Sequence, residues 1–192
     1  MLGKIKMKIV VVALMATLIT LMSQATLAYY STVGKATNVV TSGNIQFIIH
    51  EMTDQGKEFP KEGVYIVPGD IVSKKVSIES DCEHPFYLRV KMVYGIDSQE
   101  LTSEDCFKLN INSENWLLHD GWYYYTGILQ PGQQTPEVFS HVEIVGSKVD
   151  TSYIGKTLSI TVKAQAVQSE NNPLPVEGDY TSVSGWPAER EG

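Results

Sequence analysis

The sequence predicts an all-β protein: an antiparallel β-sandwich of the jelly-roll type, preceded by a signal-peptide helix. Three observations predict this fold. Apolar and polar residues alternate with a period of two through most of the chain after residue 28, as in half-buried strands. Turn signals such as Pro68-Gly69-Asp70 separate these segments, and short strands divided by turns are typical of sandwiches. No convincing apolar stripe at helical spacing runs for ten residues or more after residue 28.

Residues 1–28 are predicted to form a secretory signal peptide. Three lysines in the first eight residues precede an apolar run over residues 9–22, and small or polar residues then lead to Ala28. This order is typical of a cleaved signal. Cleavage between Ala28 and Tyr29 places the mature protein outside the cell, with membrane contact only before cleavage. The alternative is an uncleaved anchor, because the uncharged stretch is long enough to span a bilayer.

The mature chain is acidic. The sequence has 15 Lys and Arg against 22 Asp and Glu, and the signal peptide removes three lysines and no acid. Twelve basic residues against 22 acidic ones leave a formal charge of −10. Such a surface repels nucleic acid and anionic lipid, and favours cations, cationic surfaces or copies of the chain as partners. The alternative explanation is that the charge only keeps a secreted protein soluble.

Four segments alternate most clearly, and each is expected to turn one face inward. In chain order the inward residues are Ile45, Phe47 and Ile49; Val72, Val76 and Ile78; Phe86, Leu88, Val90, Met92 and Tyr94; and Leu158, Ile160, Val162, Ala164 and Ala166. Further strands are expected at residues 30–37, 106–111, 121–127 and 138–145, with a short helix near residues 103–106. Together these elements predict one sandwich domain over residues 38–168.

Residues 169–192 differ in composition from the rest of the chain. They are polar and contain several Pro, Gly and Ser residues, so a flexible tail is expected. Within this tail, residues 174–178 resemble a sortase signal with Glu177 where Thr is required. Neither an apolar segment nor a basic cluster follows, and wall anchoring by that route is not expected.

The two cysteines of the chain, Cys82 and Cys106, leave two interpretations open. An even pair in a secreted chain can form one disulfide. Alternatively, each thiol is a small buried apolar group.

The densest aromatic cluster of the mature chain is Trp122-Tyr123-Tyr124-Tyr125. On a strand, Trp122 and Tyr124 share one face, and Tyr123 and Tyr125 share the other. Because one face can enter the core, Trp122 and Tyr124 become candidate interface aromatics. The alternative is a central strand that is covered on both sides, or rings that lie under a loop.

The sequence predicts no catalytic, cofactor-binding or metal-binding residues, so the chain is not expected to be an enzyme. His50-Glu51 supplies only the first half of a zinc-protease motif, because Asp54 stands where the second histidine is required. A nucleophile elbow and a Gly-rich phosphate loop are also absent from the sequence.

Three stretches carry a family resemblance. Thr26-Leu27-Ala28-Tyr29-Tyr30-Ser31 leads on to Ser42-Gly43-Asn44-Ile45, the Pro68-Gly69-Asp70 turn leads into an alternating strand, and a late strand ends in Ala164-Gln165-Ala166-Val167-Gln168. In these features the chain resembles the TasA/CalY family of secreted bacterial proteins, whose CalY branch is also called camelysin.

The resemblance implies a subunit of extracellular, biofilm-matrix fibres, which is processed by a SipW-type signal peptidase. In this family the new N-terminus can be donated as a strand to the next subunit, and head-to-tail donation propagates a filament. The candidate donor is residues 29–37, with Tyr29, Tyr30 and Val33 as expected anchors. The expected partners are copies of the chain, the signal peptidase and other matrix components. The alternatives are a camelysin-like metal-dependent surface peptidase and a surface adhesin that uses exposed aromatics.

Overall fold

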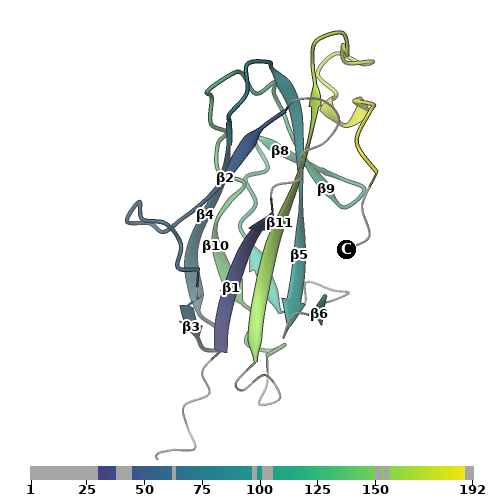
Figure 1. Cartoon of the computed structure of the whole chain (residues 1–192). Helices are drawn as coiled ribbons and strands as arrows, with labels where there is room; N and C mark the ends of the chain where they lie inside the picture. Colours follow the sequence, from purple (N-terminus) through teal and green to yellow (C-terminus); the bar gives the residue numbers. More distant parts are fainter. Residues whose placement is uncertain are drawn as a thin grey trace, which may run out of the picture.

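A computed structural model describes residues 30–37, 45–61, 64–96, 99–100, 106–149, 153 and 156–188. In these residues eleven strands form two sheets, which confirms the predicted all-β sandwich (Figure 1). Across the same residues, no helix has both the length and the apolar character needed to cross a membrane. The predicted signal peptide and residues 103–105 of the predicted short helix lie outside the described part.

The larger sheet has seven strands. Its order is β3 (Val64–Ile66), β1 (Tyr30–Thr37), β11 (Thr157–Gln168), β5 (Phe86–Ile96), β9 (Trp122–Tyr125) and β8 (Trp116–His119), and β6 (Gln99–Glu100) pairs with the end of β5. Neighbouring strands are antiparallel except β1 and β11, which run parallel. The predicted antiparallel sandwich is therefore corrected at one pair of strands, and that pair includes the candidate donor.

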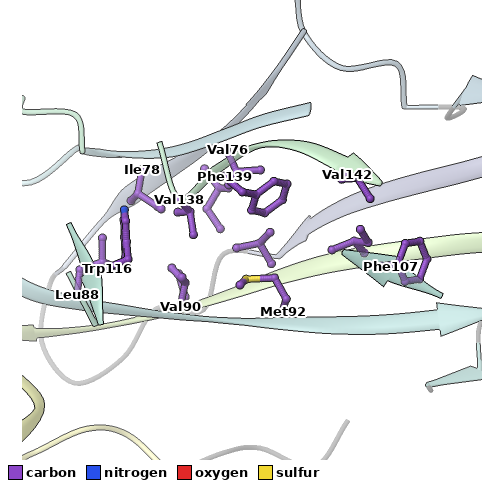
Figure 2. Packing of buried hydrophobic residues seen from close by; sticks show 14 of the residues in the cluster. Val76, Ile78, Leu88, Val90, Met92, Phe107, Trp116, Val138, Phe139 and Val142 are labelled. Carbon is purple, nitrogen blue, oxygen red and sulfur yellow. The ribbon is translucent and has the colours of Figure 1, made fainter. Parts of the chain in front are cut away.

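The smaller sheet has four strands, in the order β2 (Phe47–Met52), β4 (Ile71–Ser80), β10 (Phe139–Ile144) and β7 (Phe107–Leu109). All its pairs are antiparallel. Figure 2 shows its side chains, among them Ile78 and Phe139, meeting Val90 and Met92 of the larger sheet.

The predicted inward faces form the core. On β11, Leu158, Ile160 and Val162 are 0% exposed, and the inward side chains of β5 from Phe86 to Met92 are also buried. Alternation therefore identified the buried face of both long strands, because residues two apart on a strand share a face. Three short strands, β3, β6 and β8, were not predicted.

A buried ion pair interrupts the apolar face of the smaller sheet. Lys74 of β4 is 0% exposed, and its Nζ lies 2.9 Å from Oε1 of Glu51 on β2. The ammonium also lies 4.7 Å from the ring centre of Phe59, which is buried. Burial lowers the pKa of Lys74 below its ordinary value of 10.5, although the negative charge of Glu51 opposes the shift.

The hairpin of β8 and β9 turns at Asp120 and Gly121. Both residues have positive φ, 48° and 75°, which is the combination that a type I′ hairpin turn requires. The turn pairs His119 with Trp122 and aligns the two aromatic-rich strands. Tyr123 and Tyr125 pack against the core, whereas Trp122 and Tyr124 lie on the opposite face of the sheet.

Candidate assembly interface

The candidate donor strand occupies a slot in its own subunit. β1 lies between β3 and β11 in the larger sheet (Figure 1). Its parallel register with β11 runs from Ser31 opposite Thr157 to Thr37 opposite Lys163. On its other side, residues 30–32 pair antiparallel with β3. β1 is thus held by two backbone ladders, although it is the first strand of the described chain.

The slot depends on β1 for its pairing. Among the described strands, β3 has no sheet partner except β1, and β11 has only β5 on its other side. Without β1, residues 157–163 of β11 would form an edge with unpaired N–H and C=O groups, and β3 would lose its ladder. An open edge of this kind is a template for another strand.

Of the three expected donor anchors, Tyr30 and Val33 lie in this register, and they face different neighbouring strands. Tyr30 lies opposite Ile66, which is 1% exposed, and Val33 lies opposite Ser159. The register instead places Gly34 opposite the fully buried Ile160. Tyr29 and the predicted cleavage site at Ala28 lie outside the described residues.

A second surface lies on the outer face of the larger sheet, around Arg89 of β5. Its guanidinium lies 4.3 Å from the ring centre of Trp122 and 4.5 Å from that of Trp186. Nη1 donates a hydrogen bond to the Tyr124 hydroxyl at 2.8 Å. Nε and Nη2 donate to Oε1 of Gln165 at 3.0 and 2.6 Å. We refer to these four sheet residues, Arg89, Trp122, Tyr124 and Gln165, as the Arg89 platform.

The C-terminal tail covers the Arg89 platform. Trp186 meets Tyr124 edge to face, with ring centres 5.7 Å apart, and Val183 is only 5% exposed. A 3-10 turn, η2 (Tyr180–Ser182), begins at Asp179, whose carboxylate accepts hydrogen bonds from the backbone N–H and hydroxyl of Thr181. These bonds hold the pKa of Asp179 below its usual value. Residues 179–187 thus pack on the sheet, where the sequence predicted a flexible tail.

The candidate interface aromatics are not exposed, which corrects their predicted position. Trp122 is 5% exposed and Tyr124 is 4% exposed. The alternative stated for this strand, covered on both sides, matches the structure, and the outer cover is the chain's own tail. An adhesin that uses these two rings would first have to displace the tail.

The open question of the disulfide is answered against a bond, since both Cys82 and Cys106 are free thiols. Cys82 lies just before β5 and donates to the carbonyl of His84. Cys106 adjoins Phe107, whose ring stacks on Tyr94 near the far end of β5. The eight residue steps from Phe86 to Tyr94 span about 26 Å of strand, far more than the reach of a disulfide.

The histidines of the described part do not belong to clusters of side chains that could bind a metal ion. His50 Nε2 lies 2.7 Å from Glu79 Oε2 across the β2–β4 pair, while Glu51 turns inward to Lys74. Within the described ranges, no three His, Cys, Asp or Glu side chains are placed to hold a metal ion.

Sequence reasoning missed Arg89, Gln165 and Trp186 as members of one cluster. Arg89 and Gln165 stand on outward faces of predicted strands, where charged and amide side chains are ordinary. Trp186 offered a signal, because an isolated tryptophan in a polar tail carries a large apolar ring that gains from burial.

Comparisons of the chain with protein-family models, with curated proteins and with solved structures found no significant match.

Proposed function

We propose that the chain is a secreted structural subunit of an extracellular matrix fibre that assembles by exchange of β1 between copies. Export, cleavage after Ala28 by a SipW-type peptidase and polymerisation with its own copies belong to this proposal. The observation that carries it is the position of β1, a strand next to the predicted cleavage site that fills a slot between β3 and β11.

The physical argument rests on the kind of contact that β1 makes. Its register with β11 and β3 consists of backbone ladders, and a ladder is satisfied equally by the same strand from another copy. Exchange therefore conserves the pairing of every strand in the slot. When each copy gives its strand to one neighbour and receives a strand from another, the contact is head-to-tail and extends without closing.

The experiment locks β1 in its own slot. Lys35 and Thr161 lie directly opposite each other, and neighbouring strands are about 4.8 Å apart, which suits a disulfide. A Lys35→Cys/Thr161→Cys chain beginning at Tyr29 would be compared by negative-stain microscopy with the Lys35→Cys single variant. Both would also carry Cys82→Ser, so that the native half-buried thiol cannot compete.

We expect fibres from the single variant, monomers from the oxidised lock, and fibres again from the lock after reduction. Fibres from the oxidised lock would overturn strand exchange while leaving a fibre subunit possible. Monomers from every form, at high protein concentration and in mild acid, would overturn the fibre proposal itself.

A further inference from the structure

The tail divides into an anchor, a linker and a docking segment. Ser169 is the anchor: its N–H and hydroxyl both donate to the carbonyl of Pro85, at 3.1 and 3.0 Å. Residues 170–178 form a linker in which no residue is buried. The docking segment, residues 179–187, contacts the Arg89 platform through Trp186 and Pro187.

The docking segment binds through a few specific groups. Tyr180 meets Tyr87 of β5 edge to face, with ring centres 6.3 Å apart. Gln165 Nε2 donates to the carbonyl of Pro187 at 3.3 Å, while Trp186 lies against Arg89. An aromatic anchor on arginine, with a buried apolar residue beside it, is the composition of a binding hot spot.

Charge also matches the tail to this face. Residues 169–188 contain three acidic side chains and no Lys or Arg. The outer face of β5 and β11 carries Arg89, Lys91 and Lys163, and the last two are directly opposite each other in the register. In a chain with an excess of acid, this is a local concentration of positive charge that favours an acidic segment.

The docked tail nevertheless leaves one buried hydrogen-bond donor without a partner. The indole N–H of Trp186 is buried and has no acceptor among the described residues, and an unsatisfied buried donor weakens the docked state. Residues 169–188 of the tail also contribute no sheet strand. Its release therefore leaves every backbone ladder of the sandwich intact.

We infer that the Arg89 platform is a docking site that accepts the docking segment of a second copy of the chain as well as its own. The ten residue steps from Ser169 to Asp179 reach about 33 Å when extended, which is enough to cross to an adjacent molecule. Reciprocal exchange gives a closed two-fold contact. This contact uses neither β1 nor its slot, so the inference is independent of the proposed function.

Competition from the chain's own tail sets the conditions of the test. A short tether gives the tail an effective concentration on the order of millimolar, so the unmodified protein exchanges tails only when it is crowded. Two full-length secreted variants remove this competition. Trp186→Ala leaves a free platform with a defective tail, and Arg89→Ala leaves an intact tail with a defective platform.

The test is light scattering of a 1:1 mixture of these variants, over a concentration series, against each variant alone. We expect a heterodimer in the mixture, with association at least about tenfold tighter than either variant shows with itself. Val176→Ser, in the exposed linker, replaces Trp186→Ala in the control mixture and should not give the heterodimer, because its own tail still covers its platform.

A second platform variant keeps the test informative if Arg89→Ala does not fold. Gln165→Glu keeps the size of the side chain and an acceptor for Arg89, but it replaces the amide that donates to Pro187 with an oxygen. If the mixtures associate no more tightly than their components, while circular dichroism shows folded variants, tail exchange is overturned.

Discussion

Lys74 and Arg89 are two cations that this protein holds against aromatic rings in opposite ways. Lys74 lies inside the sandwich, fully buried, beside one ring and paired with the carboxylate of Glu51. Arg89 lies on the outer face, between rings and neutral hydrogen-bond acceptors, and no carboxylate among the described residues pairs with it. The difference follows from their chemistry. An ammonium is a compact, strongly hydrated charge, whereas a guanidinium is planar, stacks on rings and is weakly hydrated.

The largest effect should come from removing only the acid of the buried pair. Glu51→Leu leaves Lys74 without its counter-ion in the core, so the free energy of unfolding should fall by about 3–5 kcal/mol. Chemical denaturation measures this loss.

The matched control is the double variant Lys74→Met/Glu51→Leu, which fills the same space with apolar groups. It should regain stability to within about 1 kcal/mol of the natural chain or exceed it. If the double variant is as unstable as the single one, the loss of stability comes from poor packing at this site and not from the unpaired charge.

Arg89→Ala should lower the free energy of unfolding by about 2 kcal/mol, because it removes the stacking on two indoles and the bonds to Gln165 and Tyr124. Arg89→Lys should recover only part of this loss, since an ammonium cannot stack and donate in a plane at once. Denaturant titrations compare Arg89→Lys with the natural chain. Equal stability would contradict the argument that this site requires a guanidinium rather than an ammonium.

Trp186→Ala should cost about 1 kcal/mol or less in global stability, because residues 169–188 add no strand to the fold. Its clear effect should be local. In limited proteolysis, Trp186→Ala should be cut within residues 170–188 several-fold faster than the natural chain. Mass spectrometry of the products measures the rate and the position of cleavage. Trp186→Phe retains a ring over Arg89 and should remain close to the natural rate. Unchanged cleavage in Trp186→Ala would mean that Tyr180 and Val183 suffice to hold the tail.

The smallest effect concerns pH. Because the folded pKa of Lys74 lies below 10.5, the unfolded chain binds more protons between the two pKa values, so the contribution of Lys74 to stability should rise with pH in that window. The readout is the stability of the natural chain minus that of Lys74→Met/Glu51→Leu. This difference cancels the tyrosines common to both chains. A difference that falls over the same window would contradict the lowered pKa.

The predictable part of this fold is the part with long alternating strands. β5 and β11 were found with their inward faces because nine or more residues of alternation leave little ambiguity. β3 and β8 were not predicted, because three or four residues are too few to establish an alternating pattern. The parallel pairing of β1 could not be predicted, since alternation fixes the face of a strand and not its neighbour.

The candidate sites were predicted less well, for related reasons. Composition alone suggested a free tail, but Trp186 packs on the face that carries Arg89, and Val183 is buried. The same face buries Trp122 and Tyr124, which a single strand pattern assigns only to a side of the sheet. Lys74 stands in phase with the inward Val76 and Ile78, and only Glu51, on another strand, makes that position acceptable.

The pairing of Ser31 with Thr157 has a consequence for the order of events during synthesis. About 126 residues separate these partners, and with so large a sequence separation we expect their contact to form late in folding. β1 would leave the membrane first, yet the strand that receives it is made almost last. If the chain is exported as proposed, the first strand of the growing molecule has no slot of its own during that interval, whereas a neighbour whose own β1 has not inserted would offer one. The choice between self-insertion and assembly would then be kinetic, decided by chain growth and local crowding rather than by any difference in final contacts.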